Sequence, residues 1–359
     1  MSTIRYPHHG RHFYQALSRQ VHDAIATQPH ASQSLLLAKI ALILLVYIAS
    51  YAAMLSVDGA GNALSWVIHG VATALVGFNI MHDGAHESLS RSRRLNRLAA
   101  LTFNLIGSHR RYWAEKHNRN HHGFTNVDGL DEDIDALGLL RMSPTQPHRA
   151  WHRYQHWYAW CLYPLTSLFW FFVLDYKAYF RQAIGDRAYS KPMGRAEHIE
   201  FWLSKALYLV LYLLLPSFVL GLSQTLVGFL LMHAVLGFLF AVVFQLAHVV
   251  SLAEFSQPNN TGELPDTWAI HQLRTTVDFA PQSRVLNALL GGLNMQVEHH
   301  LFPRISHIHY PQIHHLIRRE CELQGHPIRT YQTLWQALTG HSAHLKALGH
   351  PLAKPIQAK

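Results

Sequence analysis

The candidate reactive residues of this chain lie in three short histidine clusters. They are His82 and His86; His117, His121 and His122; and His299 and His300 preceded by Gln296. Each lies just outside a long apolar segment. Residues three and four apart share a helix face, so each cluster can direct two or three imidazoles at one point. Seven histidines exceed the needs of one ion, because biological metals take roughly four to six protein and solvent ligands. The clusters therefore predict two metal ions held by three segments of the chain.

The chemistry of such a site depends on its surroundings. Neutral imidazole binds Fe, Zn, Cu or Ni, so the ligand type alone does not choose the metal. The clusters have no obvious carboxylate ligands beside them, unlike soluble di-iron bundles. They lie at the mouth of apolar segments that could accommodate a hydrocarbon chain, and attack on an unactivated C–H bond needs a redox-active metal, which zinc is not. Two irons at a membrane boundary therefore favour an oxidase that acts on lipid chains.

The elements that must position these clusters are long apolar helices. Of the 359 residues, 49% are hydrophobic and only 14% are charged, against ~25% in ordinary soluble domains. Four segments are long and apolar enough to span a membrane, namely residues 35–57, 62–81, 202–222 and 225–250. The sequence predicts one domain, residues 1–359, of an all-α integral membrane protein with two helical hairpins and a histidine-rich cap that includes residues 251–359. The two cysteines exclude a disulfide framework and a cysteine-held iron–sulfur cluster.

Basic residues predict the orientation of these spans. Arg5, Arg11 and Arg19 precede the first span, further arginines follow the second, and the tight turns at 58–61 and 223–224 have none. Positive residues stay cytoplasmic, so both termini and all three clusters should be cytoplasmic, at the inner membrane in a bacterial cell. The net charge of +9 is accordingly attributed to orientation and anionic head groups, not to nucleic acid.

Crossing parity places the remaining aromatic segment. The cluster ending at His122 can meet His299 only if an even number of crossings separates them, and the spans 202–222 and 225–250 already supply two. Residues 157–175, which contain Pro164, are therefore expected to lie in the interface or to dip into the membrane and return.

The clusters resemble the three histidine boxes of the membrane fatty-acid desaturases. The resemblance is carried by residues 82–88, 113–135 and 291–313, and the glutamine opening the third box is similar to that of front-end and bacterial acyl-lipid or acyl-CoA desaturases. It implies a di-iron centre that uses O2 and two electrons to remove two hydrogens from an acyl chain. The implied iron ligands are His82, His86, His117, His121, His122, His299 and His300.

Two further residues are candidates for the metal centre. His248 ends the last span and is either an eighth ligand or a hydrogen-bonded packing residue. Gln296 stands where other desaturases have histidine, and could contact metal directly or through water. By contrast, His69 and His233 lie in the middle of spans and are expected to be packed polar residues.

Acidic and basic residues near the boxes have two interpretations each. Carboxylates orient imidazoles by accepting from the nitrogen that does not bind metal, and the candidates are Asp83, Asp131, Asp133, Asp278 and Glu298. Residues 128–135 could equally form a solvated acidic loop that caps a helix. Arg110, Arg111, Lys116 and Arg119 could grip a phosphate-bearing head group or only set orientation.

Two alternative functions compete with desaturation. A lipid hydroxylase, ketolase or conjugase would use the same ligands, and product analysis separates these outcomes. A metal transporter would place ionisable ligands near the bilayer midplane, whereas these clusters lie at span ends.

The electron balance predicts a partner. Reduction of O2 to two waters takes four electrons and the substrate supplies two. The sequence contains no His-Pro-Gly-Gly haem motif and no strand–GxGxxG–helix unit. We therefore expect a separate donor, a ferredoxin or a cytochrome b5 with its reductase. Double-bond position, chain length and acyl carrier are left open.

Overall fold

A computed structural model describes residues 4–7, 12–27, 31–57 and 59–351, so Arg11 and Asp58 of the predicted topology lie outside the described residues. The described residues are mostly helical. Their strands form two short ribbons, an antiparallel pair of β1 (Ala183–Ile184) and β2 (Arg187–Ala188) and a parallel pair of β3 (Asp278–Phe279) and β4 (Thr330–Tyr331). The predicted helical class is therefore confirmed.

In the part of the chain that the structure describes, five helices are long and apolar enough to cross a membrane, as expected for a membrane protein. They are Gln33–Ser56, Gly61–Ala85, Ala150–Arg181, Arg195–Leu220 and Leu222–His248. Each of the four predicted spans falls largely within one of these helices. The remaining helix, Ala150–Arg181, contains the aromatic segment, residues 157–175.

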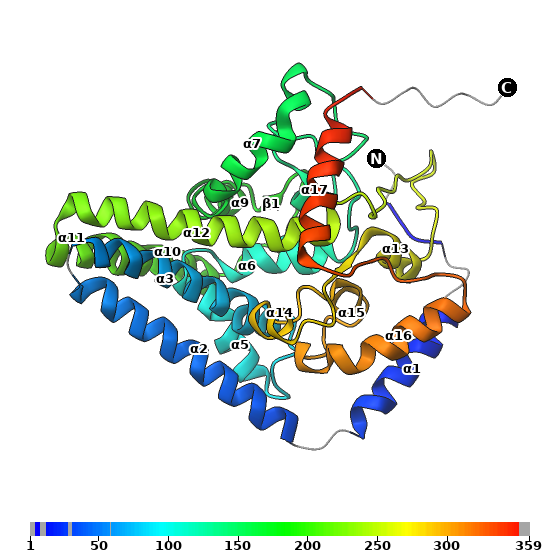
Figure 1. Ribbon diagram of the computed structural model, residues 1–359, viewed down its shortest axis with the longest axis horizontal. Helices are drawn as coiled ribbons and strands as arrows, with labels where there is room; N and C mark the ends of the chain where they lie inside the picture. Colours follow the sequence, from blue (N-terminus) through cyan, green and yellow to red (C-terminus); the bar gives the residue numbers. More distant parts are fainter. Residues whose placement is uncertain (1–3, 8–11, 28–30, 58, 352–359) are drawn as a thin grey trace.

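The longest unbroken α-helix among the described residues forms the centre of the bundle. This helix, α12 (Leu222–His248), packs against α3 (Ala60–Val76), and α3 packs in turn against α2 (Ala31–Ser56) (Figure 1). Glycines permit this close packing: a Cβ at Gly70 would lie 2.7 Å from the carbonyl oxygen of Met232. The remaining long helix is continuous through α10 (Arg195–Leu209), the π-helical turn η7 (Val210–Leu214) and α11 (Leu215–Leu220).

The two histidines in the middle of the membrane helices are packed polar residues, as predicted. His69 is hydrogen-bonded to the hydroxyls of Ser50 and Tyr212, at 2.8 and 2.9 Å. His233 is likewise bonded to Ser167 and Tyr208, at 2.9 and 2.8 Å. Such bonds satisfy polar groups in an apolar environment and connect neighbouring helices.

The apolar helix Ala150–Arg181 is broken into short pieces near Pro164. They are η4 (Ala150–Tyr154), α7 (Gln155–Leu162), η5 (Tyr163–Leu165), α8 (Thr166–Phe169), η6 (Trp170–Leu174) and α9 (Asp175–Arg181). At its start, Gln155 accepts a hydrogen bond from the backbone of Arg141 at 2.8 Å. Just beyond its end, the carbonyl of Ala188 accepts one from Arg119 at 2.8 Å. Both ends are therefore attached to the segment that contains and follows the second histidine cluster.

A helical cap covers the end of α12 at His248. Its elements are α1 (His12–Ala26), α4 (His82–Ala85), α5 (Arg93–Leu105), α6 (Arg110–Trp113), η2 (Ala114–His121), η3 (Glu132–Ile134), α13 (Trp268–Thr275), α14 (Arg284–Leu289), α15 (Gln296–Leu301), η8 (His307–His309), α16 (Tyr310–Leu323) and α17 (Leu334–Leu348). Figure 1 shows α1, α13, α15 and α16 gathered at one end of the molecule, with α17 crossing α12. Leu17, Val21, Leu301, Ile313 and Ile317 are fully buried in the core of this cap. The membrane side that the cap faces stays a prediction.

Candidate metal centre

Each histidine cluster lies on a different element at the junction of bundle and cap. The first lies on α4, which continues α3 through a π-helical turn, η1 (Gly77–Met81). The third lies on the short helix α15. The second lies on η2, a π-helix, so the backbone N–H of His122 donates to the carbonyl of His117, five residues back, at 3.0 Å. This turn brings the Nε2 atoms of His117 and His122 within 3.2 Å of each other.

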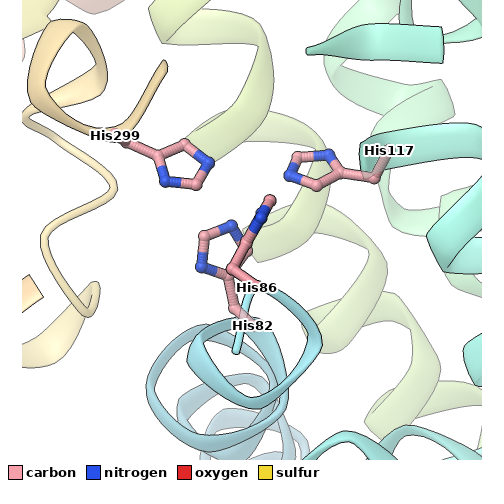
Figure 2. Close-up of side chains that lie close together, drawn as sticks. All are labelled: His82, His86, His117 and His299. Atoms are coloured by element: carbon pink, nitrogen blue, oxygen red, sulfur yellow. The ribbon is translucent and has the colours of Figure 1, made fainter. Parts of the chain in front are cut away.

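The three clusters converge into two adjacent groups of imidazoles. Figure 2 shows the first group, in which His82 and His86 come from α4, His117 from η2 and His299 from α15, with potential ligand atoms all within 4.8 Å of one another. The second group contains His121, His248 and His300 under the same distance limit. His122 lies between them, because it forms a further set with His299 and His300. All eight histidines are buried.

The protonation state of these rings suits metal binding. Burial lowers the pKa of His117, His122, His299 and His300 well below its usual value, so these imidazoles are neutral and keep a lone pair. Among the described residues, the Nε2 atoms of His86, His248, His299 and His300 have no hydrogen-bond partner. A buried polar atom without a partner is costly unless something else satisfies it. The donor set therefore fits two metal ions.

Three residues outside the boxes lie within hydrogen-bond distance of Nδ1, the ring nitrogen that is not directed at the metal site. The Nδ1 of His300 lies 2.8 Å from Oε1 of Gln272, that of His248 lies 3.2 Å from the carbonyl oxygen of Thr275, and that of His299 lies 3.2 Å from the hydroxyl of Tyr310. An Nδ1–H bond of this kind fixes the tautomer and turns Nε2 toward the metal. Gln272 and Tyr310 were not predicted, because each lies on a different helix from the histidine that it contacts.

Two of the five predicted acidic residues lie beside a ring nitrogen of a box histidine. Asp131 lies 3.0 Å from Nδ1 of His121, and Asp133 lies 3.4 Å from the same atom. Burial lowers the pKa of His121, but the two carboxylates outweigh burial and the net pKa is raised. Asp131 also accepts from the backbone N–H groups of Asn126 and Asp133, so it caps the loop as well. Asp131 therefore both contacts His121 and caps the short helix Glu132–Ile134, but it is buried and not solvated.

The other three predicted acids bind elsewhere. Asp83 accepts from Ser306 at 3.0 Å and lies 2.8 Å from Nδ1 of His307. Glu298 lies 2.8 Å from Nδ1 of His314, and Asp278 accepts from the backbone of Val297. Asp83 and Glu298 each adjoin a box histidine in sequence, but neighbouring side chains on a helix diverge by about 100°.

Gln296 and the basic residues have identifiable partners. Gln296 donates through Nε2 to the carbonyl of Leu293, while its buried Oε1 has no partner among the described residues. Arg110 pairs with Glu200, Lys116 with Asp133, and both Arg111 and Arg119 with Glu115. Each of these four cations is thus already paired with a carboxylate, and Arg111 and Arg119 share one.

An apolar cavity of about 310 Å³ lies near the imidazoles, although none of the described histidines lines it. Residues of the broken helix, α12 and the loop 132–142 line it. A narrow apolar gap, too small to hold a water molecule, lies beside His82, and Trp113, Phe240 and Phe244 line both this gap and the cavity. This aromatic wall lies between a hydrocarbon-sized space and the first group of histidines, an arrangement suited to oxidation of an apolar chain.

Comparison with known proteins gives one consistent family. Residues 60–332 match the fatty acid desaturase family. The chain is 38% identical to an sn-1 linoleoyl-lipid 6-desaturase of Arthrospira platensis over 82% of this chain and 80% of the relative. It is 35% identical to the Synechocystis sp. protein of the same name, over 80% of each chain. It is 37% identical to an acyl-lipid (8-3)-desaturase of Physcomitrium patens over 78% of this chain and 59% of the relative.

Proposed function

The chain belongs to the fatty acid desaturase family, and from this premise we propose that its seven box histidines, together with His248, hold two iron ions. The resemblance predicted from the histidine boxes is thus confirmed, and the protein is an oxidoreductase that desaturates fatty acyl chains with O2. The observation that carries the iron proposal is the convergence of eight buried imidazoles into two adjacent groups. When bound, two irons and O2 would supply the oxidising power that removes one hydrogen from each of two neighbouring carbons.

The acyl chain occupies the apolar cavity in this proposal. The lumen is mostly apolar, and its lining includes Leu137, Leu139, Leu165 and Phe169, which are all exposed. Apolar side chains exposed at a cavity of a membrane protein suit entry from the lipid side. The substrate is therefore an acyl group attached to a membrane lipid, the substrate type in the names of the relatives.

The residues of this chain have distinct roles in the proposal. Trp113, whose ring stacks on His117 at 4.3 Å between centroids, positions the chain together with Phe240 and Phe244. Burial of the histidines excludes water from the reacting carbons. Gln272 and Tyr310 keep His300 and His299 in the tautomer that presents Nε2.

An external donor supplies the two electrons that the substrate does not provide. We expect a ferredoxin, or a cytochrome b5 with its reductase, to dock on the cap. Purified protein with acyl lipid, O2 and NAD(P)H should form no product until the donor and its reductase are added. Sustained turnover without them would contradict the need for a separate donor.

Four membrane crossings and a cytoplasmic cap complete the proposal. The attachment of both ends of Ala150–Arg181 to the segment around the second box supports a helix that dips into the membrane and returns. The arginines before the first span and after the second support a cytoplasmic cap.

The function is tested by expressing the chain in a desaturase-null host. Mass spectrometry of its lipids should reveal a new double bond, and the gently purified protein should contain two irons per chain. His86→Ala, His121→Ala and His300→Ala should each abolish product while membrane insertion persists. An oxygenated product without a double bond would favour a hydroxylase, and full activity in these variants would overturn the ligand assignment.

A further inference from the structure

Helix α5 has three distinct faces. One face is buried and consists of Asn96, Ala99, Ala100, Phe103 and Asn104. The second carries the exposed side chains of Arg93, Arg94 and Arg97. The third is apolar yet exposed: Leu95 is 50%, Leu98 62% and Leu105 36% accessible. At about 100° per residue, the arginine face lies between the buried face and the exposed leucines.

The helix is rigidly fixed to the bundle, so these outer faces have a defined direction. Asn96 both donates to and accepts from the backbone of Ser90, at 2.7 and 2.8 Å. Asn104 donates to Glu200 of α10 at 3.0 Å. On the inner side, a Cβ at Gly84, between His82 and His86, would lie 2.6 Å from the Cβ of Ala99.

The neighbouring helix indicates what the exposed leucines face. Helix α10 contacts α5 and belongs to one of the membrane-spanning candidates. Its Leu203 and Leu207 are exposed, as expected for lipid-facing residues. Helix α5 also contacts α4, which carries His82, so its exposed leucines lie at the end of the bundle nearest the metal centre.

The arginines of α5 lack the carboxylates that neutralise other cations near the boxes. No carboxylate among the described residues lies within 4.0 Å of Arg93, Arg94 or Arg97. By comparison, Arg110, only five residues after the helix, is bonded to Glu200 at 2.6 Å. Three unpaired guanidinium groups therefore stand beside an exposed apolar face.

We propose that α5 is a binding surface for anionic phospholipid, with its arginines on the phosphate group and its leucines against the acyl chains. Guanidinium binds phosphate with two parallel hydrogen bonds, and amphipathic helices with basic and apolar faces bind anionic membranes. Exposed leucines next to the arginines favour a lipid over an acidic protein, whose docking would leave that apolar face uncovered. This inference concerns a surface outside the metal centre and does not depend on the proposed function.

The test measures lipid binding by the purified full-length protein in detergent. Native mass spectrometry would compare dioctanoyl-phosphatidylglycerol with dioctanoyl-phosphatidylcholine. The protein should prefer the anionic lipid, and the preference should fall as salt rises. Each arginine near the head group contributes about fivefold to the affinity, so the variant with Arg93→Gln, Arg94→Gln and Arg97→Gln should lose most of the preference.

A matched control removes three exposed arginines elsewhere, by Arg181→Gln, Arg318→Gln and Arg319→Gln, and should retain the preference. Lysine at the three α5 positions should retain more of the preference than glutamine does, because the charge is kept although the paired hydrogen bonds of guanidinium are lost. Equal binding of both lipids by the unaltered protein, or equal loss in the control, would overturn the proposal. Unchanged lipid binding by the glutamine variant would also overturn the proposal. If the same variant had a raised KM for an acidic donor protein, α5 would be a protein-docking surface.

Discussion

Gln272→Leu should weaken metal binding without touching a ligand. Gln272 is fully buried, and its Oε1 lies 2.8 Å from Nδ1 of His300 and 3.0 Å from the hydroxyl of Thr125. Leucine has a similar volume but no acceptor, so the Nδ1–H of His300 would lose its nearer partner and keep only the hydroxyl of Thr125, which lies 3.3 Å away. An unsatisfied buried group costs about 1–3 kcal/mol, and loss of a partner of this kind lowers metal affinity about 10–100-fold. The two ranges agree, so we expect a loss of roughly 30-fold at the second histidine group.

The assay is competition with graded concentrations of an iron chelator, followed by metal analysis and measurement of desaturase activity. The control is Gln155→Leu, which removes a glutamine that is equally buried and donates to the carbonyls of Arg141 and Leu345, away from the histidines. The control should lower the unfolding temperature and leave the chelator curve unchanged. An unchanged chelator curve for Gln272→Leu, or the same shift in the control, would refute the argument that this glutamine positions His300.

The remaining predictions concern a ligand, a buried carboxyl and topology. His248→Ala should lower the iron content from two toward one per chain, whereas His233→Ala, which removes bonds to Ser167 and Tyr208, should leave it at two; equal iron in both variants would remove His248 from the ligand set. Burial raises the pKa of Glu132 from 4.5 to about 7, so its stabilising contribution is complete below pH 4.5 and lost as pH rises through 7. Unfolding measurements should therefore detect a loss of up to about 3 kcal/mol by pH 8 that Glu132→Gln lacks, and identical pH profiles would contradict this. Reporter fusions after residues 125 and 190 should both be cytoplasmic, and opposite sides would mean that Ala150–Arg181 crosses the membrane.

The sequence predicted the parts of the site that depend on local spacing. The box histidines recur at intervals that direct several rings to one point, and long apolar segments identify the helices at whose ends they lie. His248 could be proposed because it ends such a helix. These inferences need only the chain's own periodicity, and the structure places all eight rings together.

Partners across long sequence distances could not be predicted in this way. Gln272 is 28 residues from His300, and Asp83 is 224 residues from His307. The choice of Asp83 as a partner of His82 relied on adjacency in sequence, whereas the direction of a helical side chain depends on its rotation about the axis. Nothing in the local sequence indicated that Asp83 would be hydrogen-bonded to His307, which also contacts Lys39.

The π-helix of the second box, as well as the spacing of its histidines, determines which rings meet. Because Ala114–His121 closes its hydrogen bonds five residues back, it contains one residue more per turn than an α-helix would need. If the same residues formed an α-helix, His122 would lie about 140° around the axis from His117, because five residues at about 100° each exceed one full turn by that angle. The contact between these two histidines therefore depends on the π-helical turn itself, and substitutions that favour a regular α-helix across this segment should separate them.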